Sequence, residues 1–95
     1  MLNYHEPHDE LSDKARSLTR ALNSLKEEIE AVDWYHQRVD VEPDEALKAI
    51  LQHNMYEEIE HACMALEWLR RNMDGWDKEL TTYLFKKGDI AQLEE

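Results

Sequence analysis

The stretch LSDKARSLTRALNSLKEEIEAV, residues 11–32, decides the fold of this 95-residue chain. Its apolar residues recur alternately four and three positions apart, at Leu11, Ala15, Leu18, Leu22, Leu25, Ile29 and Val32. A 3.5-residue period predicts a long helix that packs along a nearly parallel helical partner. We expect this helix to cover residues 11–38.

The stretch VDVEPD, residues 39–44, predicts a break after this helix. Pro43 disfavours a helical conformation at Glu42 and suits the first turn of a new helix. A second helical pattern covers residues 44–72, and a short third one covers residues 76–85, before Gly88. We therefore predict an all-α fold in which the two long helices form an antiparallel hairpin.

This pattern divides the chain into three parts. Residues 1–10 and 88–95 show no helical period, so we predict two tails, the N-terminal one flexible. Residues 11–87 would form the hairpin with its short C-terminal helix. Two helices cannot enclose a core on both sides, and two copies of the hairpin would complete a four-helix bundle by homodimerisation.

The charge balance excludes several classes of partner. Asp and Glu number 22 against 11 Lys and Arg, which gives a net charge of −11. Affinity for nucleic acid and for anionic membranes comes largely from Lys and Arg, so we expect neither partner. The single Cys excludes a disulfide framework and fits a reducing cytosol. The first residues have no basic start and no apolar run, so we expect no secretory signal.

Glu58 is the most informative anomaly of the second helical pattern. At 100° per residue it lies within about 40° of the apolar positions of that helix, which are Leu47, Leu51, Ala62, Ala65 and Leu69. His61 follows at i+3, on the flank of the same face. A carboxylate in an apolar setting is costly unless it is protonated, paired or metal-bound. Glu58 and His61 are therefore candidate metal ligands.

Glu28 is the matching candidate on the first helix. It lies on the edge of the apolar stripe, where Tyr35 could donate a hydrogen bond to a carboxylate or an aqua ligand. A carboxylate-bridged di-iron bundle takes a Glu from each of two helices and a Glu-x-x-His from each of two others. One chain holds half of this set, and a homodimer would supply all of it. Such a ligand set suits iron or manganese.

Other interpretations of these residues remain open. Glu58 could be a core carboxylate paired with a Lys or Arg of the partner, His61 a hydrogen-bonded core histidine, and Glu28 a solvated edge residue. A second metal cluster could form in the N-terminal tail, but a loose tail loses conformational entropy when it binds. Its members would be His5, Glu6, His8 and Asp9.

Several stretches of the chain resemble the encapsulated ferritins. The longest are EEIEAVDWY at residues 27–35, EEIEHA at 57–62 and LEWLRRN at 66–72. Shorter ones are YLF at residues 83–85 and HEP at 5–7. The resemblance extends over nearly the whole chain.

The resemblance implies half a ferritin-like bundle per subunit, with dimers assembled into a ring-shaped homodecamer. The implied activity is a ferroxidase, which oxidises Fe²⁺ with O₂ at a di-iron centre shared between two subunits, with two irons per dimer. The implied metal ligands are Glu28, Glu58 and His61, with Tyr35 beside the centre. The family's members are cargo of encapsulin nanocompartments, which implies a cytoplasmic location inside that shell and storage of the iron as mineral.

The resemblance also implies an iron-uptake site at Glu27, Glu30 and Trp34. On a helical wheel these residues lie opposite the apolar stripe, as one outward cluster. A solvated acidic face beside a Trp in an assembly contact is the alternative.

One feature departs from the family. Encapsulated ferritins carry a C-terminal extension with a targeting peptide, and the stretch GDIAQLEE, residues 88–95, does not match one. Two other function classes also remain open, a non-catalytic iron buffer and a purely structural dimer.

Overall fold

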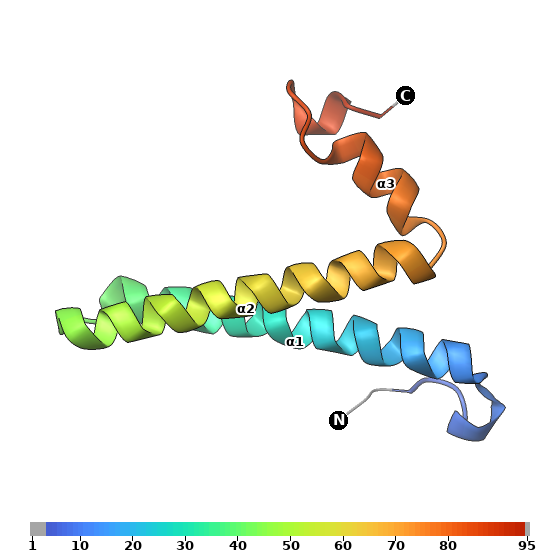
Figure 1. The fold of residues 1–95 in the computed structure, drawn as a ribbon, viewed down its shortest axis with the longest axis horizontal. Coiled ribbons are helices and arrows are strands. Elements are labelled where there is room, and N and C mark those ends of the chain that lie inside the picture. Colours follow the sequence, from blue (N-terminus) through green and yellow to red (C-terminus); the bar gives the residue numbers. More distant parts are fainter. Residues whose placement is uncertain (1–3, 95) are drawn as a thin grey trace.

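Two long antiparallel helices lie side by side and form the body of the molecule (Figure 1). They are α1, Asp13–Val41, and α2, Glu45–Asn72. The computed structural model describes residues 4–94, which also form α3, Trp76–Tyr83, and the short 3-10 helices His8–Glu10 and Ile90–Gln92. No strand occurs within this range. The predicted all-α hairpin with a short third helix is confirmed.

Both long helices begin at a residue whose side chain caps the first turn. Ser12 Oγ accepts a hydrogen bond of 3.0 Å from the Ala15 amide, and Asp44 Oδ2 accepts one of 2.8 Å from the Leu47 amide. Such caps satisfy amide groups that have no partner inside the helix. They set the starts of α1 and α2 one or two residues after the predicted positions.

The ends of two helices differ from the prediction. α1 continues through Val41, although residues 39–44 were expected to break it, because Pro43 restricts only the residue before it, Glu42. α3 ends at Tyr83 instead of residue 85, because Leu84 is extended and Phe85 has a φ of 59°. The two predicted tails are described only in part, since residues 1–3 and 95 lie outside the described range. Their separation from the hairpin stays a prediction.

Much of the apolar surface of the hairpin is exposed to solvent. Leu69 is the one fully buried side chain among residues 4–94, and Ile29 of the predicted stripe is 56% exposed. A compact chain of this length has a radius of gyration of about 12 Å, whereas this chain has 17.0 Å. One helix covers only one flank of the stripe, so the other flank needs a further partner.

α3 leaves the end of α2 at a steep angle (Figure 1). The turn between them contains Gly75, whose φ of 102° lies in the left-handed region that favours glycine. Arg70 of α2 stabilises the turn. It donates hydrogen bonds of 2.7 and 2.8 Å to Glu67 and one of 2.6 Å to Asp77 of α3. We call this corner between α2 and α3 the elbow.

Across residues 4–94, no helix has the length and apolar content needed to cross a bilayer.

Candidate metal centre

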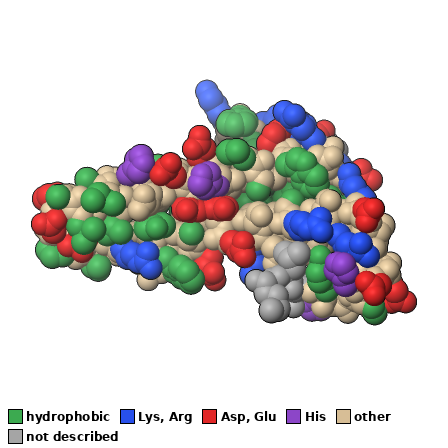
Figure 2. Space-filling model, turned by 60° about the horizontal axis from the view of Figure 1, so that its bottom comes forward, with side chains coloured by type: hydrophobic (Ala, Val, Ile, Leu, Met, Phe, Trp, Pro, Cys, Tyr) green, Lys and Arg blue, Asp and Glu red, His purple; other side chains and the backbone are tan. Residues whose placement is uncertain are grey.

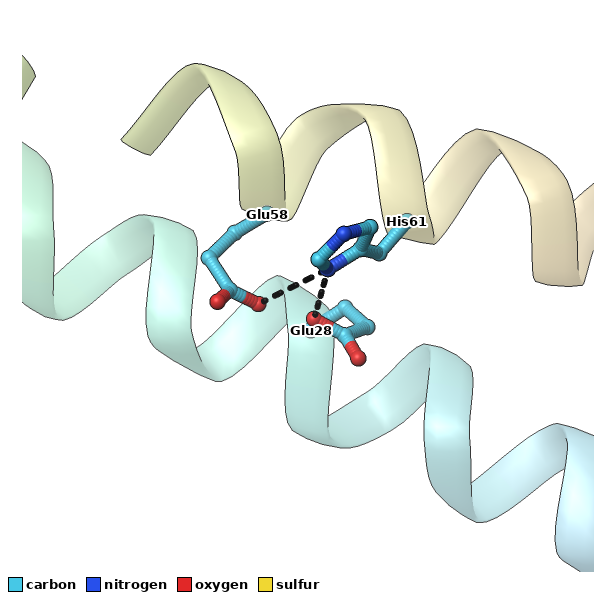
Figure 3. Close-up of side chains that lie close together, drawn as sticks. All are labelled: Glu28, Glu58 and His61. Carbon is cyan, nitrogen blue, oxygen red and sulfur yellow. Dashed lines mark ion pairs between the residues drawn. The ribbon is translucent and has the colours of Figure 1, made fainter. Parts of the chain in front are cut away.

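Three predicted ligands meet where α1 and α2 pack together. Glu28 projects from α1, and Glu58 and His61 project from α2 toward it (Figure 3). One candidate ligand atom from each residue lies within 4.8 Å of the other two. In the part of the chain that the structure describes, this is the one group of three or more His, Cys, Asp or Glu side chains so arranged.

The distances leave room for a shared ion. His61 Nδ1 lies 3.6 Å from Glu28 Oε2 and 3.8 Å from Glu58 Oε2 (Figure 3). Both distances exceed a good hydrogen bond, so His61 is a neighbour of the two carboxylates without being hydrogen-bonded to either. Two ligand atoms that each lie about 2.1 Å from one ion can be at most about 4.2 Å apart. Both His61 distances fall inside that limit.

The two carboxyl groups disturb each other. A hydrogen bond with Glu58 raises the pKa of Glu28, burial adds to the rise, and His61 opposes it. Two carboxylates this close are stabilised by a shared proton or by a cation between them. A metal ion with two or three positive charges would offset the repulsion between the two carboxylates more completely than a shared proton would.

The centre is open on one side. The side chains of Glu28 and Glu58 are each 25% exposed, and that of His61 is 47% exposed. Ile29 and Ile59, which directly follow the two carboxylates in the sequence, are also exposed. The three candidate ligands are therefore accessible from outside the hairpin.

Tyr35 does not join this group of ligands. It lies seven residues after Glu28 in α1, which is about 10 Å along the helix axis. Its ring instead lies beneath the Arg38 guanidinium, 5.2 Å from the ring centre. A position beside the iron centre stays a prediction for this residue.

The three residues of the predicted uptake site share an exposed stretch of α1. Glu27, Glu30 and Trp34 are all exposed, and Trp34 keeps about half of its surface in solvent. Their side chains are thus free to meet an approaching cation, and the uptake role itself stays a prediction.

The N-terminal candidates form no comparable site. His8 Nδ1 lies 3.4 Å from Asp9 Oδ1, but no third ligand joins them among the described residues. Arg16 instead holds this segment against α1, because its Nε and Nη2 donate bonds of 3.1 and 2.8 Å to the His8 carbonyl oxygen.

The sequence analysis did not predict the ion pairs at the elbow. The spacing of Glu67, Arg70 and Arg71 on one helix face signals ion pairs at i+3 and i+4, which the structure contains. Arg70 and Arg71 together lower the pKa of Glu67 to about 2. The third partner, Asp77, carries no such signal, because its position depends on the turn at Gly75.

Comparisons with known proteins show the family of the chain. Residues 3–87 match the EncFtn-like family. The chain is 63% identical over 92 residues to a "Ferritin-like protein" of Thermotoga maritima, covering 97% of this chain and 81% of that one. It is 53% identical over 90 residues to an "Encapsulated ferritin-like protein" of Rhodospirillum rubrum, covering 95% of this chain and 64% of that one.

A solved structure has the same fold. The crystal structure of protein ne0167 from Nitrosomonas europaea is 56% identical in sequence and superposes with a TM-score of 0.91. The match covers 94% of this chain and 98% of that one.

Proposed function

The chain belongs to the EncFtn-like family, as its resemblance to the encapsulated ferritins predicted, and we propose that it is a ferroxidase. It would oxidise Fe²⁺ to Fe³⁺ with O₂ at a di-iron centre shared between two subunits. The observation that carries this proposal is the convergence of Glu28, Glu58 and His61 at one accessible edge of the hairpin. Membership of the family supports an iron-related, ferritin-like function.

The shared centre follows from the number of ligands. Di-iron sites in helical bundles use two lone Glu residues and two Glu-x-x-His pairs, and one chain offers one of each. A second copy that meets the same edge would supply the other half, with two irons per dimer. The exposed Ile29 and Ile59 beside the ligands would be covered by the same contact.

The chain's own residues would bind and orient the iron. Metal binding needs ionised carboxylates and a neutral imidazole nitrogen, so it releases protons. A proton competes with the ion for Glu28, because Glu58 raises the pKa of Glu28. His61 presents Nδ1 to both carboxylates. Bound iron supplies the electrons, since each Fe²⁺ gives one electron to O₂.

The neighbouring residues would assist from outside the ligand set. Glu27, Glu30 and Trp34 would attract and pass on Fe²⁺, since their exposed face is acidic. Tyr35 would act beside the centre only after assembly, because in one chain it lies about two turns from Glu28.

Assembly and storage complete the proposal. Dimers would join into a ring-shaped homodecamer, and an encapsulin shell would enclose it and hold the ferric mineral. The name of the Rhodospirillum rubrum relative, an encapsulated ferritin-like protein, supports this partner.

Replacing one ligand tests the activity. Glu58→Ala should lower the rate of Fe²⁺ oxidation by at least about 100-fold, since changes outside the ligand shell alone cost about 10–100-fold. Glu57→Ala is the matched control, because Glu57 is an exposed neighbour that pairs with His53 instead. The measurements are ferric absorbance and O₂ consumption after addition of Fe²⁺.

The same assay separates the alternative functions. A chain that binds Fe²⁺ without consuming O₂ would be an iron buffer. A dimer that binds no iron would be structural. Full activity in Glu58→Ala would refute the ligand assignment.

A further inference from the structure

Met64 carries an exposed thioether next to the candidate metal centre. Its side chain is 65% exposed, whereas the other methionines that the structure describes, Met55 and Met73, are half-buried. Met64 follows His61 by three residues in α2, so the Cβ atoms of these two residues lie about 5–6 Å apart. A sulfur atom that is open to solvent thus lies one helical turn from a candidate iron ligand.

Packing within the hairpin does not account for this methionine. Met64 lies about 120° from Glu58 around α2, and Glu58 points toward α1 (Figure 3). In the space-filling view, hydrophobic side chains adjoin His and carboxylate groups at the middle of the hairpin (Figure 2). The exposed side of α2 next to the ligands therefore carries an apolar, sulfur-containing group in place of a charged one.

Two more oxidisable side chains adjoin Met64. Cys63, Met64 and Trp68 line one surface hollow of about 470 Å³, together with charged side chains. Cys63 is a free, exposed thiol, and Trp68 is 37% exposed. Thiols and thioethers are common targets of oxidants. The hollow thus exposes two sulfur groups and an indole on the side of α2 that continues from His61.

The proposed ferroxidase would supply an oxidant at this place. A centre with two irons delivers two electrons in one turnover. Reduction of O₂ to hydrogen peroxide takes two electrons and two protons, whereas reduction to water takes four of each. A turnover at one centre therefore converts two Fe²⁺ and one O₂ to two Fe³⁺ and one H₂O₂.

We propose that Met64 is the side chain that this peroxide oxidises first. The O–O bond of H₂O₂ breaks, one oxygen atom bonds to Met64 Sδ, and the other leaves as water with both protons. The sulfur is oxidised by two electrons to the sulfoxide, and the peroxide is reduced by the same two. The source of the peroxide rests on the proposed ferroxidase activity, and the choice of target rests on the exposure and position of Met64.

Oxidation of Met64 would protect the ligand beside it. An imidazole that takes up oxygen loses its capacity as a metal ligand, and His61 is the one His in the group of candidate ligands. Methionine sulfoxide is returned to methionine by reductases. Met64 would thus consume the oxidant in a reversible reaction before it modifies His61.

Addition of H₂O₂ to the full chain in chelating buffer tests the target alone. Sulfoxide should form at Met64 roughly fivefold faster than at Met55 or Met73, since susceptibility to oxidation follows exposure. Met55 is the matched control, because it precedes Glu58 by three residues and is half-buried. Peptide mass spectrometry measures the three rates, and equal rates at Met64 and Met55 would overturn the proposal.

Addition of Fe²⁺ in air tests the source. Met64 sulfoxide should form in the unaltered chain and in Glu57→Ala, and it should fall to background in Glu58→Ala. About two Fe²⁺ should be oxidised for each O₂ consumed, as a two-iron centre requires. A ratio of four, equal sulfoxide in Glu58→Ala, or oxidation of Cys63 with Met64 left intact would each refute the inference.

Met64→Leu tests the protective role. Leu is a volume-conserving replacement, so the initial rate of Fe²⁺ oxidation should stay within about twofold of that of the unaltered chain. After repeated additions of Fe²⁺, its activity should decline faster and His61 should carry added oxygen. Met55→Leu, the control, should decline like the unaltered chain, and equal decline in the two variants would show that Met64 protects nothing.

The two proposals fail in different ways. An unaltered chain that oxidises no Fe²⁺ would refute the ferroxidase and with it the source of the peroxide. Equal sulfoxide rates with added H₂O₂ would refute only Met64 as the target, because chelator keeps iron out of that measurement.

Discussion

Glu28 and Glu58 lie close enough together to destabilise the metal-free chain. Their proximity raises the pKa of Glu28, so the folded chain holds this proton more tightly than the unfolded chain does. Stability is therefore lost as pH rises from the unfolded pKa through the folded one. The metal-free protein is therefore destabilised wherever both carboxylates are ionised.

Glu28→Gln should consequently stabilise the metal-free chain at pH 7, by roughly 0.5 kcal/mol, the size of a surface like-charge pair. The gain should be smaller at pH 4, because the raised pKa of Glu28 favours its protonated form in acid. Urea unfolding in chelating buffer at the two pH values measures it. A variant that is less stable than the unaltered chain at pH 7 would show that Glu28 contributes favourably without metal.

The clustering of Glu28, Glu58 and His61 could be predicted from the sequence because each residue leaves a local signal. Glu58 stands out as a carboxylate on an apolar face, and His61 follows it at i+3. Ile29 was predicted to lie in the buried stripe, but the pattern cannot tell which flank a single partner helix covers. The place of Tyr35 depends on a neighbouring subunit, which no spacing within one chain describes.

At the scale of helices, caps determine where each element begins. Asp44→Ala should destabilise the chain by about 1 kcal/mol, because the Leu47 amide loses its partner at 2.8 Å. Glu45→Ala, one residue into α2, is the control and should cost less. Urea denaturation compares the two, and equal effects would mean that helix-end charge matters more than the cap.

The elbow should loosen in acid. Arg70 and Arg71 lower the pKa of Glu67 to about 2, so its stabilising effect is present above the ordinary carboxyl range and is lost as pH falls toward 2. Trp76, whose indole Nε1 donates to Met73 Sδ at 3.2 Å, lies beside the turn and reports on it. Its indole NMR signal should shift in this range, and Glu67→Gln should remove that step. An unchanged acid response in the variant would exclude Glu67 as the cause.

Helix interiors were predictable, and the turns at their ends were less so. Periodicity identified all three helices, since it is repeated over many residues. α1 ends at Val41 because Pro43 restricts the conformation of Glu42 and of no earlier residue. The end of α3 depends on the positive φ of Phe85, which the sequence does not predict. The angle of α3 depends on Gly75 and on the Arg70–Asp77 pair, which is formed only after the turn.

At the scale of the whole molecule, the single chain lacks both a complete core and a complete set of candidate ligands. It buries a single side chain completely among its described residues, and its three candidate ligands are half of the set that a di-iron centre needs. Both facts lead to the same expectation, that iron binding and association are linked. A ligand that only the dimer can bind stabilises the dimer by mass action.

Native mass spectrometry of the chain with Fe²⁺ tests the shared centre most directly, because it counts metal ions on each oligomeric species. We predict two irons on the dimer and its multiples, none retained on the monomer, and a shift toward dimers as Fe²⁺ is added. Glu58→Ala should abolish the metal-bearing dimer, and Glu57→Ala should retain it. A monomer that holds two irons, or dimers that form equally without iron and bind none, would contradict the shared di-iron centre.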